Sequence, residues 1–92
     1  MSPREQAQIR ILQWLIDHQD KFNAPYGIID SLQNVGKGKV RTITFGQSRW
    51  LDCTVSIWSP NRITVDAQGP ASRNIDNLYR SVDELLVALE KM

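Results

Sequence analysis

Apolar positions recur with a helical period at the two ends of the chain and with a strand-like period of two in the middle. Near the N-terminus, Ser2, Pro3 and Glu5 form a capping box with proline at the first helical position, so a helix is expected to begin at Pro3. Its apolar residues cover an arc of roughly 220°, wider than the single stripe of a surface helix. They are Ala7, Ile9, Ile11, Leu12, Trp14, Leu15 and Ile16. This helix is therefore expected to lie between two layers or to meet a second molecule.

Residues 23–27 contain Pro25 and Gly27 and read as a break in the chain. Apolar residues then recur at helical spacing over Ile28–Val35, and Gly36 stands where a C-cap glycine would. The spacing predicts a short helix over Ile28–Val35. An extended segment is the competing interpretation.

Three strands are expected in the middle of the chain. The first covers Lys39–Phe45, and Phe45 favours the register that turns Arg41, Ile43 and Phe45 toward the core. The second, Trp50–Trp58, alternates between apolar and polar residues, and so does the third, over residues 63–68. The pattern is typical of an antiparallel meander with one core face and one polar face.

A short fourth edge strand is expected within Ile75–Tyr79, and a second capping box, Ser81 to Glu84, begins the last helix. The predicted fold is α+β: a three-stranded antiparallel meander, with that short fourth strand at its edge. An N-terminal helix, a short second helix and a C-terminal helix pack on one face. Residues 1–92 are expected to form one domain, since a chain of this length has room for one core.

Composition narrows the classes of protein. An apolar fraction of 41% with 23% charged residues is ordinary for a folded domain. No apolar run approaches the roughly 18 residues of a membrane span, so no membrane association is expected. A single cysteine permits no intramolecular disulfide, and a cytoplasmic location is expected. Residues 37–80 carry seven Lys or Arg against three Asp, a local charge of +4.

The sequence offers no set of residues for metal or nucleophilic chemistry. One histidine and one cysteine cannot supply a zinc site, so no metal and no cofactor are expected. Cys53 lies in the core-facing row of its strand, and His18 falls within the apolar arc of the first helix. Asp52 and Asp66 are expected on the polar face of adjacent strands, where they offer an alternative: a small-molecule site or a small enzyme. The expected catalytic set is nevertheless empty.

The polar sheet face is the main candidate binding surface. Trp50 and Trp58 are expected to share it with Thr54, and basic residues sit at the strand ends and turns: Lys37, Lys39, Arg49 and Arg62. Tryptophan and arginine are favoured anchors of protein interfaces. Aromatic residues beside basic ones also suit stacking of single-stranded nucleic acid or RNA. The structural alternative is that each tryptophan covers a hydrophobic edge of the fold.

The wide apolar arc predicts a homodimer whose interface contains Ile9, Leu12, Trp14 and Ile16. The chain's size, its layout and the helix start at Tyr79–Leu86 resemble small phage or mobile-element accessory proteins, several of which inhibit a host protein by binding it. From the residues we expect a non-enzymatic interaction module whose partner is a protein, an accessory protein or inhibitor. Two alternatives stay open: a single-stranded nucleic-acid or RNA binder, and the small-molecule site at Asp52 and Asp66.

Overall fold

The computed structural model describes residues 2–22, 27–36 and 38–92 of the chain, and the side chains of residues 33–35 are outside this description. Five strands form one antiparallel sheet in the order β1-β2-β3-β4-β5. The elements are α1 (Pro3–Asp17), β1 (Ile29–Val35), β2 (Gly38–Gln47), β3 (Leu51–Ser59), β4 (Arg62–Gln68), a 3₁₀ helix (Pro70–Asn74), β5 (Leu78–Tyr79) and α2 (Val82–Glu90). The predicted α+β class is confirmed.

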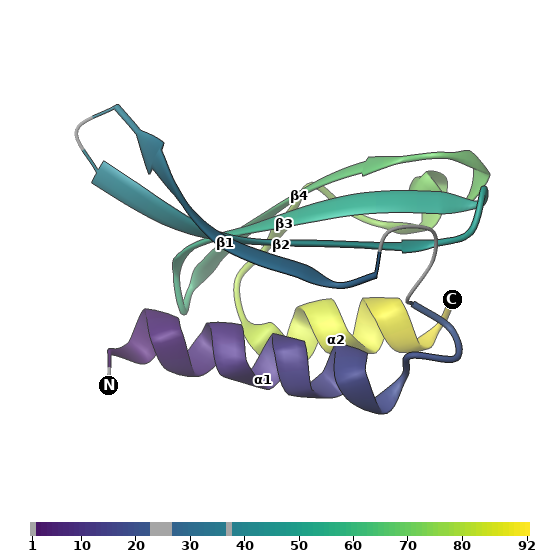
Figure 1. Ribbon diagram of the computed structural model, residues 1–92, viewed down its shortest axis with the longest axis horizontal. Helices are drawn as coiled ribbons and strands as arrows, with labels where there is room; N and C mark the ends of the chain where they lie inside the picture. The colour runs from purple at the N-terminus through teal and green to yellow at the C-terminus, as the bar shows by residue number, and fades with distance from the viewer. Residues whose placement is uncertain (1, 23–26, 37) are drawn as a thin grey trace.

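The two α-helices run side by side beneath one face of the sheet, and the end of the β1–β2 hairpin bends away from them (Figure 1). Both helices begin at the predicted caps: the Ser2 hydroxyl accepts a hydrogen bond from the Glu5 amide, and the Ser81 hydroxyl accepts one from the Glu84 amide. Each cap satisfies a backbone N–H that the helix itself leaves unpaired.

The core lies between the sheet and the helices, and the sequence alternation of the middle strands decides which side chains reach it. The predicted register of β2 is confirmed, since Ile43 and Phe45 are buried against the helices and Arg41 lies at the rim. Buried side chains from the other elements complete this core: Ala7, Ile11, Leu15, Phe22, Leu51, Cys53, Val55, Ile57, Ile63, Val65, Ile75, Tyr79, Val82, Leu85 and Leu89.

The predicted short helix over Ile28–Val35 is wrong. This segment is strand β1, paired antiparallel with β2 from Ile29 opposite Thr44 to Val35 opposite Gly38. Gly36, with a φ of 58°, belongs to the hairpin turn and does not cap a helix. The apolar residues lack alternation because β1 is an edge strand: Ile29 faces the outer side of the sheet and Leu32 the helix side, both partly exposed.

The sheet therefore has two strands more than the predicted meander, β1 and β5. The fourth strand expected within Ile75–Tyr79 is present as β5, which pairs with β4 over two residues only. The first helix is not enclosed between two layers, because the sheet covers one of its faces while Ile9 and Ile16 remain exposed. Part of its wide apolar arc thus faces solvent.

Candidate functional site

The outer face of the sheet, away from the helices, carries rows of hydroxyl side chains that bond to one another across the strands. The Ser31 and Thr42 hydroxyl oxygens are 2.7 Å apart, and those of Thr44 and Thr54 are 3.4 Å apart. Thr42 is buried despite lying on this face. Thr54, a predicted binding residue, is thus engaged within the sheet.

Trp58 lies on this face, where a register irregularity between Ile57 and Ser59 interrupts the β3–β4 ladder. Its indole N–H donates to the Thr64 hydroxyl at 2.9 Å, and the Arg62 guanidinium lies 5.5 Å from its ring centroid. The ring is half-buried. These contacts agree with the structural alternative for Trp58, a side chain that covers part of its own fold.

Trp50 does not share the strand face with Trp58 as predicted, because it lies in the turn before β3. Its side chain is 57% exposed, next to the exposed Arg49. Its carbonyl accepts a hydrogen bond from the Ala71 amide at 2.9 Å. A Cβ at Gly69, where φ is 104°, would come within 2.5 Å of that carbonyl oxygen. The turn is therefore held against the 3₁₀ helix while the indole remains exposed.

The predicted binding set does not come together as one patch. Lys39 and Arg62 lie with Trp58 at one end of the sheet, whereas Arg49 and Trp50 lie at the opposite end of β3. Lys37 lies outside the described residues.

Asp52 and Asp66 are both exposed on the outer face, and the register makes them diagonal neighbours, since Asp52 pairs with Gln68 and Thr54 with Asp66. Cys53 between them points to the core, where burial, followed by the charges of Asp52 and Asp66, raises the pKa of its thiol to about 12. A thiol with so high a pKa is a poor nucleophile at neutral pH.

His18 ends α1 as a packed residue. Its ring stacks on Trp14 with centroids 3.9 Å apart, and its Nδ1 lies 2.7 Å from the Trp14 carbonyl oxygen. Among the described residues, no three His, Cys, Asp or Glu side chains are grouped so that they could hold a metal ion.

Comparison with known proteins adds no relative. No protein-family model, curated protein or solved structure matches this chain. Within the described part of the chain, neither helix has the length and apolar character that crossing a bilayer would require.

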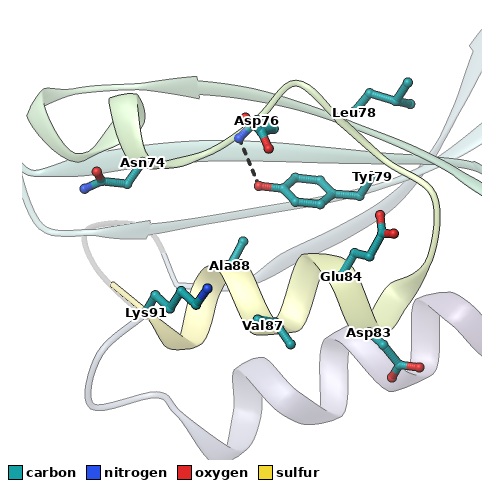
Figure 2. A pocket seen from close by; sticks show the side chains of 9 residues that line it. All are labelled: Asn74, Asp76, Leu78, Tyr79, Asp83, Glu84, Val87, Ala88 and Lys91. Atoms are coloured by element: carbon teal, nitrogen blue, oxygen red, sulfur yellow. Dashed lines mark hydrogen bonds between the residues drawn. The ribbon is translucent and has the colours of Figure 1, made fainter.

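One open groove of about 760 Å³ lies between α2 and the segment that carries β5. Figure 2 shows Tyr79 and Asp76 on one wall, and on the other Glu84, Val87 and Ala88 of α2 with Lys91 just after its end. Three of its polar side chains have partners: the Tyr79 hydroxyl accepts from the Asp76 amide, the Glu84 carboxylate accepts from the Arg80 amide, and the third is Asp83. Asp83 pairs with Arg10 at 2.6 Å.

The opposite edge of the sheet presents apolar side chains. Polar contacts orient α1 there: the Gln8 amide donates to Asp30 on β1, and Glu5 pairs with Arg41 on β2 at 3.5 Å. The helical period turns Leu12 and Ile16 toward this side of α1, and Ile9 lies on the face of α1 away from the sheet, where it also lines an open pocket with Trp14 and Leu86. On β1, Leu32 points to the helix side and Ile29 to the outer face. We call the side chains that α1 and β1 leave exposed or half-buried here the α1–β1 edge surface: Ile9, Leu12, Ile16, Ile29 and Leu32.

Three of the four predicted dimer residues lie on the α1–β1 edge surface, namely Ile9, Leu12 and Ile16. Trp14 lies on the other side of α1, where Arg10 pairs with α2, and its ring packs against the buried Phe22. The sequence does not identify Ile29 and Leu32 as surface residues of this set, because its spacing predicts a helix over Ile28–Val35. The signal that could have found them was the extended alternative for that segment, since a strand presents side chains on both faces.

Proposed function

We propose that this protein is a non-enzymatic interaction module that binds a protein through the α1–β1 edge surface. One observation carries the proposal. Among the described residues, four of the seven exposed large apolar side chains belong to α1 and the neighbouring edge strand: Ile9 and Ile16 on the exposed face of α1, and Ile29 and Leu32 on the two faces of β1. Apolar side chains that gather on a surface mark interaction sites more often than isolated ones do.

The backbone of β1 supports the same surface. β1 is the terminal strand of the sheet, and no described strand pairs with its outer edge. An exposed strand edge has unpaired N–H and C=O groups that a partner strand can satisfy. The surface thus combines apolar side chains with directional hydrogen-bonding groups. This combination suits an accessory or inhibitor protein that acts in the cytoplasm by binding another chain.

The test is capture of proteins from an extract of the source cells on three immobilised versions of the chain. Wild type and Val87→Lys are expected to retain the same partner, while the double variant Ile16→Lys/Leu32→Lys is expected to lose it. Val87 is a matched control because it is 50% exposed on α2, against 49% for Ile16 on α1. Equal capture by all three versions would contradict the use of this surface.

Nucleic-acid binding is a second candidate, favoured by the exposed Trp50 beside Arg49. Single-strand binders stack bases on aromatic rings and neutralise phosphates with basic side chains. Tryptophan fluorescence titrated with single-stranded oligonucleotides should then be quenched, and less so at about 200 mM than at about 50 mM salt. Trp50→Phe should remove the quenching and Trp58→Phe should leave it. Quenching that is unaffected by salt would rule this candidate out.

A further inference from the structure

The backbone groups along the outer edge of β1 determine which kind of partner can bind there. Seven residues, Ile29–Val35, form this edge strand, and their backbone groups on the side away from β2 have no partner strand among the described residues. Natural edge strands are commonly protected by proline, lysine, a β-bulge or an inward-pointing charged residue. β1 contains neither proline nor lysine, and its pairing with β2 runs without a register shift. Its one inward-pointing charge, Asp30, accepts a hydrogen bond from Gln8 of the same chain. The occupant that satisfies such an edge is another extended strand.

Each face of the sheet has one exposed apolar side chain among the described side chains of β1. Leu32 points to the helix side and is still 45% exposed, and Ile29 on the outer face is 48% exposed. A strand added beside β1 would cover both, since neighbouring strands lie about 4.8 Å apart. Leu32 is also the middle residue of β1.

We infer that the partner of this edge is a second copy of the chain, whose β1 pairs antiparallel with β1 about a two-fold axis at Leu32. The inference rests on the proposed function, because it names the partner of the same surface. Antiparallel self-pairing centred on Leu32 uses all seven residues of the strand, and a two-fold interface requires such a self-complementary patch. The two sheets would join into one sheet of ten strands.

Charge is compatible with this register. Asp30 is the one charged residue of β1, and its carboxylate accepts a hydrogen bond from Gln8 of its own α1. Pairing centred on Leu32 separates the two Asp30 positions by four residues along the strand, roughly 13 Å. A register centred on Asp30 would set the two carboxylates directly opposite each other, which destabilises a sheet.

The geometry also decides which side chains matter most. α1 packs over β2 and β3, so strand pairing would leave the two α1 axes about four strand spacings apart, roughly 19 Å. Packed helices lie about 8–10 Å apart. Ile9 and Ile16 would therefore flank a cleft between the two helices, while Leu32 would meet its counterpart directly. Substitution of Leu32 should consequently weaken the dimer more than substitution of Ile16.

The test is the mass of the full chain by sedimentation equilibrium across the micromolar range. Wild type should form dimers, and Leu32→Lys should raise the dissociation constant by about tenfold or more, the effect of losing a central interface residue. Leu78→Lys, at an equally exposed leucine on β5, should leave the dimer unchanged. A monomeric wild type overturns the inference, and so does a dimer that Ile16→Lys breaks and Leu32→Lys spares.

Cross-linking gives a readout that does not depend on how a lysine variant folds. Leu32→Cys should form a covalent dimer with a short bifunctional thiol reagent, because directly opposed side chains have Cβ atoms about 5 Å apart. Leu78→Cys is the matched control at the other edge. The native Cys53 is buried, so it should not react with the reagent. Equal cross-linking of the two variants would show random collision and overturn the strand pairing.

The outcomes separate this inference from the proposed function. A monomeric wild type that still captures a different protein, with loss of that protein in Ile16→Lys/Leu32→Lys, keeps the proposed function and removes the self-partner. A monomer that captures nothing removes both.

Discussion

The two edges of the sheet differ in length and in cover. β5 ends one edge with two residues, of which Tyr79 is buried and hydrogen-bonded through its hydroxyl to the Asp76 amide. α2 follows it directly and contacts it. β1 ends the other edge with seven residues, and Leu32 is nearly half exposed although it points to the helix side. One edge is short and tied to a helix, whereas the other is long and has no strand or helix over it in the part of the chain that the structure describes.

This difference shows where the fold is complete and where it can accept a partner. A two-residue edge offers few backbone groups, so an added strand would gain little there. A seven-residue edge offers enough hydrogen bonds and apolar side chains to reward pairing. The same sheet can therefore be stable at its β5 side and available for binding at its β1 side. The predictions below test this contrast in order of expected effect.

The largest difference in the free energy of unfolding is expected between two leucine-to-alanine substitutions, one near each edge of the sheet. Leu85→Ala removes a fully buried side chain on α2 and should lower the free energy of unfolding by about 2–5 kcal/mol. Leu32→Ala removes a half-exposed one and should cost the monomer about 0.5 kcal/mol or less. Urea unfolding at a concentration where the chain is monomeric compares them. Equal losses would mean that the β1 edge is covered by its own chain.

Local signals explain why much of the fold was predictable from sequence. The caps at Ser2 and Ser81 depend on residues three positions apart. The alternation in β3 records burial on one face of a central strand. β1 could not be read in the same way, because an edge strand with both faces partly exposed has no strict alternation. Gly36 was equally compatible with a helix C-cap and a hairpin turn.

The candidate site was less predictable because it depends on tertiary contacts. Alternation placed Trp58 on the outer face correctly, but the sequence does not reveal that Thr64 accepts its indole N–H. The predicted strand begins at Trp50, one residue before β3, and Trp50 lies in the preceding turn. The wide apolar arc of α1 correctly indicated that the fold leaves part of this helix exposed, at Ile9 and Ile16. The neighbouring strand β1 was not predicted.

Cys53 lies on the central strand β3, so its titration tests the burial of the core independently of the two sheet edges. Burial raises the pKa of this thiol from 9.0 to about 12, so the folded chain keeps its proton where the unfolded chain loses it. Its stabilising contribution is complete below pH 9 and is lost as the pH rises toward 12, by about 1.4 kcal/mol per pH unit. Urea unfolding of wild type and Cys53→Ala between pH 8 and about 10.5 measures the difference in slope.

Burial also raises the pKa of Tyr79, and its contribution has the same sign in both proteins. The charge of Cys53 is the smallest of the causes that shift this pKa, so the difference in slope between the two proteins is due mainly to the Cys53 thiol itself. If the free energies of unfolding of wild type and Cys53→Ala fall with pH at the same slope, the thiol is not buried. Cys53 could then also react in the cross-linking experiment.

A smaller effect is expected from Ser81→Ala, which removes the cap of α2 beside the β5 edge. The Glu84 amide loses its acceptor, and the free energy of unfolding should fall by about 1 kcal/mol. Self-association should not change, because α2 contacts β5, the strand at the opposite edge of the sheet from β1. Thermal unfolding and sedimentation of this variant, with Ser2→Ala as the matched cap on α1, check both parts. A weakened dimer in Ser81→Ala would argue against an interface at β1.

Amide hydrogen exchange followed by mass spectrometry, at chain concentrations below and above the dissociation constant, tests the open edge most directly. Self-pairing predicts that protection of the β1 segment rises with concentration, while the segment from β5 through α2 stays the same. Protection of β1 that is equal at both concentrations, or a rise confined to α2 and β5, would contradict the account.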